Sequence, residues 1–308
     1  MTEDAGLRLG DSPPGYRSGF VSIVGRPNVG KSTLVNRMCG RKVAITSPRP
    51  QTTRNAIRGV LTTPVAQVVF VDTPGLHKPR SVLGKRLNAV VRSTLGEVDV
   101  VLFVVDGADG VGSGDAFIAR EVSRGPVPVV TVLNKIDIAA ASSVQGGVEA
   151  LEELGGWTPY GVSALDGSGV PDLIDAIVEH LPEGPLYYPP DQVTDQPERV
   201  TVAELIREKV LEVTREEVPH SVAVVVEDIE PREDSDLVDV DAVIYVERPS
   251  QKGIVIGDKG GMLKTIGTRA RAEIEPLLGH HVYLHLRVKV ERRWQRRSAL
   301  VERFGYGS

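Results

Sequence analysis

The chain has 308 residues, of which 41% are hydrophobic and 25% charged, an ordinary composition for a soluble protein with room for two domains. It contains no run of about 18 apolar residues, which argues against a transmembrane helix. Residues 1–17 lack the apolar core of a secretory signal and are expected to form a flexible tail. The only cysteine, Cys39, excludes an intramolecular disulfide and a cysteine-cluster metal site, and we expect no disulfide-linked partner. These features favour the cytoplasm.

The net charge of −5 is distributed unevenly along the chain. Residues 251–308 hold 12 Lys and Arg against 5 Asp and Glu, a balance of +7, whereas the preceding 250 residues have a balance of −12. Such asymmetry indicates that one module contacts a polyanion and the other does not. A solvated basic surface is the alternative, and charge alone favours it.

The N-terminal part of the chain alternates short apolar runs with stretches of helical length. The runs, rich in β-branched residues, have the character of strands buried on both faces; they lie at 19–24, 68–71, 100–105 and 127–133. Helices are expected at 31–39, 83–95 and 114–124. This alternation predicts an α/β domain over 18–182, with a mostly parallel sheet covered by helices on both faces.

The pattern changes near Leu181, where proline-rich loop residues begin. Residues 183–199 are expected to form a linker, and 200–308 a smaller α+β domain. Its predicted elements are a helix at 200–216, strands at 221–227 and 237–247, a glycine-marked loop, a helix at 262–278 and a strand at 282–290.

A phosphate-binding loop follows the first predicted strand directly. The segment matches G-x-x-x-x-G-K-[ST] and opens a helix, so its backbone N–H groups and the positive helix end would face phosphates. Lys31 would reach the β- and γ-phosphates, and the Ser32 hydroxyl would ligate Mg²⁺. The residues assigned to this loop are Gly25, Arg26, Pro27, Asn28, Val29, Gly30, Lys31, Ser32 and Thr33.

A second element, Asp72-Thr73-Pro74-Gly75, follows the strand at 68–71. An acid at the carboxyl end of a strand beside the phosphate loop would hold Mg²⁺, directly or through water. The Gly75 backbone N–H would approach the γ-phosphate. Alone, these four residues would more often be an ordinary turn.

Asn134-Lys135-Ile136-Asp137 identifies the base as guanine. The Asp137 carboxylate would accept hydrogen bonds from N1–H and the exocyclic amine, donors that adenine lacks in that arrangement. Asn134 would tie this segment to the phosphate loop, and the Lys135 stem would cover one face of the base. A backbone N–H of Ser163-Ala164-Leu165 would reach the guanine O6, although small residues before a helix are also common N-caps.

The order and spacing of these four motifs resemble those of translation-factor-type GTPases, which implies GTP, GDP and magnesium as ligands. In such GTPases a switch-one threonine contacts Mg²⁺ and the γ-phosphate. Thr53 resembles that residue, with Thr52 as the alternative. The catalytic assignment is therefore Asn28, Lys31, Thr53, Asp72 and Gly75.

One catalytic position departs from the commonest pattern. Many GTPases place a water-orienting glutamine directly after the glycine of the second motif, whereas this chain has Leu76. Intrinsic turnover is therefore expected to be slow, with a backbone group, a monovalent cation or a partner completing the site. In potassium-activated relatives an asparagine at the position of Asn28 helps to hold K⁺; a simple turn-stabilising role is the alternative.

The C-terminal domain contains Gly257-Asp258-Lys259-Gly260 between a strand pair and a basic helix. This resembles the G-x-x-G loop of a type II KH domain, which clamps single-stranded nucleic acid. Apolar residues would line a groove or pack in the core: Ile254, Ile256, Met262, Leu263 and Ile266. The negative charge of Asp258 is unfavourable in a loop that approaches phosphates. The residues assigned to RNA binding are Lys252, Ile256, Gly257, Asp258, Lys259, Gly260, Lys264 and Arg269.

Further along, the run 292–297 combines four arginines with Trp294. It would track phosphates, stack a base or touch anionic lipid, or else form a solvated helix end.

One GTPase module followed by a KH-like module resembles the Era family of ribosome-assembly GTPases, over about residues 18–305. That resemblance implies binding to the 3′ region of 16S rRNA, maturation of the 30S subunit, and GTP favouring the RNA-bound state. Two alternatives stay open: an RNA-binding module with a structural nucleotide, and a GTPase at the surface of the cell membrane, since peripheral membrane association also belongs to the family.

Overall fold

The computed structural model describes residues 7–11, 13–47, 52, 57–72, 83, 96–215, 217–233 and 235–306. The chain divides into two compact units. The first consists of Met1–Ala44, Thr53–Lys78 and Leu87–Asp195, and the second of Ile45–Thr52, Pro79–Arg86 and Gln196–Ser308.

The first unit is built on a six-stranded sheet in the order β2-β3-β1-β4-β5-β6. All neighbouring strands run parallel except β2 and β3, which pair antiparallel at one edge. The strands are β1 (Arg17–Val24), β2 (Ile57–Thr62), β3 (Ala66–Asp72), β4 (Val100–Asp106), β5 (Val129–Asn134) and β6 (Tyr160–Val162). The prediction of a mostly parallel sheet is confirmed; β2 and β6 were not foreseen.

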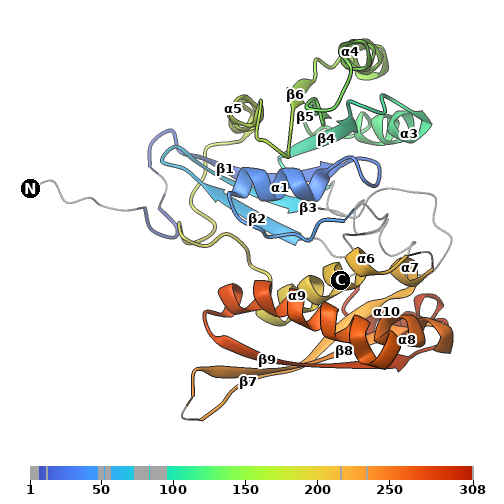
Figure 1. Cartoon of the computed structure of the whole chain (residues 1–308). Helices are drawn as coiled ribbons and strands as arrows, with labels where there is room; N and C mark the ends of the chain where they lie inside the picture. Colours follow the sequence, from blue (N-terminus) through green and yellow to red (C-terminus); the bar gives the residue numbers. More distant parts are fainter. Residues whose placement is uncertain are drawn as a thin grey trace, which may run out of the picture. The chain divides into compact units, whose positions relative to one another are not determined.

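Helices cover both faces of this sheet, because alternate residues of its strands point to opposite sides. Ile23 and Leu102 pack with α1 (Lys31–Cys39) and α5 (Val170–His180), whereas Val24 and Phe103 pack with α3 (Ser113–Val122) and α4 (Ala141–Gly155) (Figure 1). The predicted helices at 31–39 and 114–124 are thus present. Of the helix predicted at 83–95, only Leu83 belongs to the described residues, and it is buried.

The stretch that was expected to be a linker differs from that expectation. The residues of this stretch up to Asp195 belong to the first unit and are hydrogen-bonded to its strands β2 and β3. Gln67 Oε1 accepts the backbone N–H groups of Tyr187 and Tyr188 at 2.8 and 3.0 Å, and Val60 N–H donates to Val193 O at 2.9 Å. Proline-rich composition therefore indicated irregular backbone correctly, but it carried no information about these hydrogen bonds to β2 and β3.

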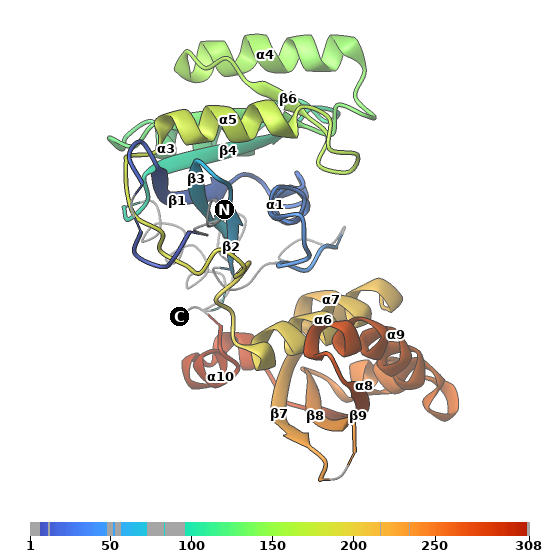
Figure 2. The ribbon, with the colours of Figure 1, turned by 90° about the vertical axis from the view of Figure 1, so that its left-hand side faces the viewer.

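The second unit has a three-stranded sheet in the order β7-β8-β9, with β7 and β8 antiparallel and β8 and β9 parallel. Helices pack against one face of this sheet (Figure 2). Its elements are α6 (Glu198–Val213), α7 (Val218–Ser221), β7 (Ala223–Pro231), β8 (Leu237–Val246), α8 (Pro249–Ile256), α9 (Gly261–Leu278), β9 (His281–Val290) and α10 (Ser298–Arg303).

Helix α8 corrects the prediction of a loop between the second strand and the G-x-x-G segment. Pro249 lies in the first turn of α8, where its missing N–H costs nothing, and Gln251 Oε1 accepts the N–H of Arg248 at 3.0 Å. This helix was not predicted because Gly253 and the β-branched residues that follow it have low helix propensity. The observed order, with two helices between β8 and β9, is that of a KH fold of the second type.

Helix α6 is buried over most of its length, and its buried charged side chains form ion pairs. Lys209 contacts Glu208, Glu212 and Glu273. Part of the segment Ile45–Thr52 packs within the same unit: Ile45 joins its core, and Glu208 Oε1 accepts the Thr46 N–H at 2.8 Å. Thr52, the alternative switch-one threonine, accepts a hydrogen bond at its carbonyl oxygen from Arg207.

Cys39 and Trp294 have clear structural roles. Cys39 is buried at the end of α1, and burial raises the pKa of its thiol to about 12. Trp294 is fully buried, and its indole N–H donates to Ser221 O at 2.7 Å. The hypothesis that Trp294 stacks on a base is therefore wrong. No helix of the described part of the chain is long and apolar enough to cross a membrane.

Candidate functional site

The phosphate loop requires glycine at both of its ends. Gly25 and Gly30 have positive φ angles of 159° and 98°. A Cβ added to Gly25 would lie 2.4 Å from Val104 O, and one added to Gly30 would lie 2.2 Å from Asn134 Nδ2. Asn28, at φ 68°, adopts the left-handed conformation that asparagine tolerates better than most residues. The loop thus curls tightly against two strand ends, with its backbone amides available to an anion.

Lys31, the first residue of α1, is 7% exposed. Its Nζ donates to Gly25 O at 3.1 Å and to Arg26 O at 2.9 Å. Burial lowers the pKa of Lys31 to about 8, an effect that the Asp72 charge partly offsets. A cation held among carbonyl groups inside a phosphate loop is suited to neutralise a polyphosphate.

Two of the three side chains predicted to hold magnesium lie together, and the third, Thr53, lies outside the described residues. Ser32, the second residue of α1, donates its hydroxyl to Asp72 Oδ2 at 2.7 Å, and Asp72 is fully buried at the end of β3. A carboxylate and a hydroxyl are the hard oxygen ligands that Mg²⁺ uses when phosphates complete its coordination. The donor set therefore fits the ion.

Asn134 connects three of the sequence motifs. Its Nδ2 donates to Val29 O of the phosphate loop at 2.8 Å, and its Oδ1 accepts the N–H of Ala164 at 3.0 Å. The side chain is 1% exposed. The prediction that Asn134 ties the base-recognition segment to the phosphate loop is confirmed, and the link to Ser163-Ala164-Leu165 is an addition.

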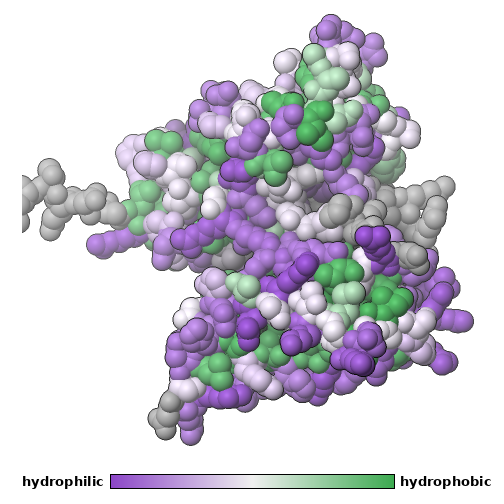
Figure 3. All heavy atoms as spheres, viewed as in Figure 1, coloured by the Kyte–Doolittle hydropathy of each residue, from purple (hydrophilic) through white to green (hydrophobic). Residues whose placement is uncertain are grey.

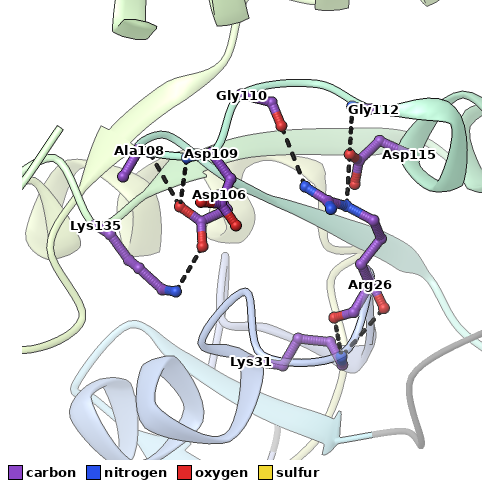
Figure 4. A network of polar contacts seen from close by, with 10 residues as sticks. Arg26, Lys31, Asp106, Ala108, Asp109, Gly110, Gly112, Asp115 and Lys135 are labelled. Atoms are coloured by element: carbon purple, nitrogen blue, oxygen red, sulfur yellow. Dashed lines mark hydrogen bonds and ion pairs between the residues drawn. The ribbon is translucent and has the colours of Figure 1, made fainter. Parts of the chain in front are cut away.

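The connection from β4 to α3 contributes two acids that sequence analysis missed (Figure 4). Asp106, the last residue of β4, accepts the ammonium of Lys135 at 2.5 Å and the N–H groups of Ala108 and Asp109 at 3.0 and 3.2 Å. Asp115, in the first turn of α3, lies 2.7 Å from Arg26 Nε. No known motif marks these residues, although an acid at the end of a strand next to the phosphate loop was a signal that could have found Asp106.

The base-recognition side of the site is open to solvent. Asp137 is exposed and accepts no hydrogen bond from a described residue. In this segment the Ser163 N–H donates to Ser168 O at 2.9 Å, and the Ala164 N–H donates to Asn134 Oδ1. Among the described residues, the backbone N–H that this segment can still offer to a ligand is therefore that of Leu165. Leu165 itself is 70% exposed. The predicted acceptor and donor for guanine are thus both on the surface.

Part of the predicted site lies outside the described residues. This holds for Thr53, Thr73, Pro74, Gly75 and Leu76, so their predicted roles stay predictions.

The G-x-x-G segment forms a tight turn into α9. Gly257, Lys259 and Gly260 have positive φ angles of 72°, 47° and 80°, and a Cβ on Gly257 would lie 2.6 Å from Met262 Cβ. Asp258 and Lys259 are exposed. The N-terminus of the 18-residue helix α9, where the first backbone N–H groups of a helix lack intrahelical acceptors, follows directly.

A groove of about 440 Å³ extends from this turn between α9 and β9. The residues that line it combine an apolar floor with two cationic side chains: Gly260, Leu263, Lys264, Gly267, Thr268, Arg271, Tyr283, Leu284 and Leu286. Tyr283 is 56% exposed. Hydrophilic atoms dominate the visible face of this unit, with hydrophobic atoms between them (Figure 3).

The groove includes only some of the residues that sequence analysis assigned to it. Lys264, Gly260 and Leu263 line it, whereas Ile266 is fully buried in the core and Arg269 lies 3.4 Å from Glu212 of α6. Tyr283, Leu284 and Leu286 were missed because they belong to a strand. The alternation of polar and apolar residues along 281–290 was the signal available in the sequence.

Two family models match the chain: one described as a 50S ribosome-binding GTPase, over residues 20–135, and a KH domain, over residues 217–295. A GTPase Era from Carboxydothermus hydrogenoformans is 52% identical over 292 residues, covering 94% of this chain and 98% of that protein. One from Nostoc sp. is 50% identical and covers 97% and 93%.

Solved structures agree with these matches. A crystal structure of Era in complex with MgGDPNP and nucleotides 1506–1542 of 16S ribosomal RNA matches with a TM-score of 0.91 and 41% identity, covering 94% of this chain and 99% of that one. A single-substitution variant of Aquifex aeolicus Era bound to GDP·AlF₄⁻ matches with a TM-score of 0.90 and the same identity and coverage.

Proposed function

The chain belongs to the Era family of GTPases, and from this premise we propose that it is a GTP-driven switch that binds the 3′ region of 16S ribosomal RNA and assists maturation of the 30S subunit. The observation that carries the proposal is the presence, in one chain, of a guanine-nucleotide site and a KH groove with a cationic rim. The Era protein solved with MgGDPNP bound that RNA segment as well.

In the nucleotide site, each group has a separate task. The loop amides and Lys31 neutralise the phosphates, and Asp137 accepts the two donors of the guanine edge. Ser32 Oγ and Asp72 Oδ2, which lie 2.7 Å apart, would hold Mg²⁺. The ion would neutralise charge at the β- and γ-phosphates. Asn134 keeps the phosphate loop and the base-recognition segment in register.

Turnover is proposed to be slow without a partner, because Leu76 cannot orient water. Asn28 stands in the left-handed region of the phosphate loop, where its exposed side chain would help to hold K⁺ near the β–γ bridge. Comparing GTP turnover in KCl and NaCl tests this part: faster turnover in KCl supports it, and equal rates remove it.

The RNA site is proposed to be the groove between α9 and β9. Unstacked bases would lie on its apolar floor and on the exposed ring of Tyr283, while Lys264, Arg271 and the N-terminus of α9 would contact phosphates. The exposed arginines Arg292, Arg293 and Arg296 would extend this contact along the backbone.

Crosslinking in cells followed by sequencing of the bound RNA tests the proposal. A peak at the 3′ end of 16S rRNA supports it, and a spread over unrelated transcripts contradicts it. With rRNA as the partner, we place the protein in the cytoplasm. Flotation with anionic liposomes tests the membrane alternative, since lipid binding that survives excess RNA would support a role at the membrane surface.

A further inference from the structure

The connection between β4 and α3 touches both halves of the nucleotide site without being one of its motifs. We define the Asp106–Asp115 brace as the residues from Asp106, which ends β4, to Asp115, in the first turn of α3. Both terminal carboxylates are buried, at 3% and 0% exposure. A buried carboxylate is retained only where charged or polar partners compensate its desolvation, so the partners indicate its role.

At one end of the brace, Asp115 holds the phosphate loop through Arg26. Asp115 Oδ2 lies 2.7 Å from Arg26 Nε and accepts the Gly112 N–H at 2.8 Å, while Arg26 Nη2 donates to Gly110 O at 3.1 Å. The stem of Arg26 lies so close to the α3 backbone that a Cβ on Gly114 would come within 2.7 Å of it. The Arg26 guanidinium therefore faces the brace (Figure 4).

The carbonyl group of Arg26 carries this restraint to the phosphate site. It accepts a hydrogen bond from Lys31 Nζ at 2.9 Å, and the next residues form the curl of the phosphate loop. Fixing the Arg26 side chain thus fixes the backbone that surrounds the phosphates.

At the other end, Asp106 holds the base-recognition segment. Its carboxylate accepts the Lys135 ammonium at 2.5 Å, and the adjacent Gly107 N–H donates to Asn134 O at 2.7 Å. Lys135 itself has a positive φ of 67°, a conformation that costs energy unless its surroundings hold it.

We propose that Asp115 and Asp106 are positioning residues that preorganise, respectively, the phosphate half and the guanine half of the nucleotide site. The proposal rests on the guanine-nucleotide site described above. It predicts different losses for ligands that differ only in phosphate number, because GDP fills both halves whereas GMP lacks the β-phosphate.

The test compares Asp115→Asn and Asp106→Asn in the full chain, by displacement of a fluorescent GDP analogue with GDP and GMP. Each substitution keeps the size of the side chain and one oxygen acceptor but removes the charge. In Asp115→Asn, GDP affinity falls roughly tenfold and GMP affinity changes little, so the GDP-to-GMP affinity ratio contracts. In Asp106→Asn both affinities fall together and the ratio stays as in the wild type.

Arg26→Met is a second variant of the phosphate half, and in it Asp115 still accepts the Gly112 N–H. Its GDP-to-GMP affinity ratio should contract as in Asp115→Asn, and it serves as the test if Asp115→Asn does not fold. Arg26→Lys, which keeps the positive charge, should have a GDP-to-GMP affinity ratio between those of Arg26→Met and the wild type. Arg124→Met, which removes an exposed arginine paired with Glu121, is the matched control and leaves the ratio unchanged.

A purely structural role would lower the melting temperature in both Asp variants and, in Asp115→Asn, reduce GDP and GMP affinity by the same factor; that result overturns the proposal. Wild-type affinities in Asp115→Asn and Arg26→Met overturn it as well. If the wild-type chain binds neither GDP nor GTP, the proposed function fails instead, so the two failures are distinguishable.

Discussion

The nucleotide site and the KH groove are both suited to phosphate-bearing ligands, but they differ in how far their side chains are buried and already paired. In the first, Lys31, Asp72 and Asn134 are at most 7% exposed and partnered before any ligand arrives. In the second, Lys264, Arg271 and Tyr283 are exposed side chains around an apolar floor. The first arrangement is preorganised and suits one small ligand of fixed geometry. The second suits a flexible single-stranded RNA, whose bases and phosphates can adjust to the side chains of the groove. Mutations should therefore affect stability and binding together in one region and binding alone in the other.

The largest effect is expected from Lys31→Ala. Removing the buried cation should reduce GTP turnover by roughly 10²–10³-fold, since no other described side chain contacts both Gly25 O and Arg26 O. The melting temperature should also fall, because the substitution leaves Gly25 O and Arg26 O without the donor that the buried Lys31 supplies. Turnover assays and thermal unfolding of the nucleotide-free protein check both points; unchanged turnover would revive the hypothesis of a structural nucleotide.

Asn134→Ala should lower stability and nucleotide affinity together. It leaves Val29 O without its donor and the Ala164 N–H without its acceptor in a buried place, which costs about 2–4 kcal/mol of unfolding free energy. Denaturant titration with and without GDP measures this loss. A variant with wild-type stability would contradict the view that the site is preorganised.

Tyr283→Ala should separate the two regions most cleanly. Loss of a stacking platform is expected to weaken RNA binding by about 1–3 kcal/mol, with GTP turnover and melting temperature unchanged, because the ring is largely exposed. Tyr160→Ala, an exposed tyrosine of the first unit, is the matched control. Equal RNA affinity of Tyr283→Ala and the wild type in a filter-binding or anisotropy assay would remove the groove as the RNA site.

The smallest effect is expected from Asp258→Asn, and its sign is the informative part. Removing a negative charge from the exposed turn should strengthen RNA binding about twofold at low salt, with less gain as salt is raised. Weaker binding would mean that the carboxylate makes a favourable contact with the RNA.

The motif-based half of the site could be predicted from the sequence because phosphate loops and guanine recognition require particular residues at particular spacings. Asn134 and the pairing of Ser32 with Asp72 are of this kind. Asp115, Gln67 and Tyr283 act through contacts with residues far away in the sequence, and no local pattern encodes such contacts. Helix α8 was missed because its glycine and β-branched residues have low helix propensity.

The most direct test of a nucleotide-controlled RNA switch measures binding of a labelled RNA with the sequence of the 3′ end of 16S rRNA to the full chain, loaded with Mg²⁺ and either GDPNP or GDP. We expect tighter binding in the GDPNP state, and loss of that difference in Lys31→Ala. Equal affinity in both nucleotide states, or equal displacement of bound GDP by ATP and GTP, would contradict the switch.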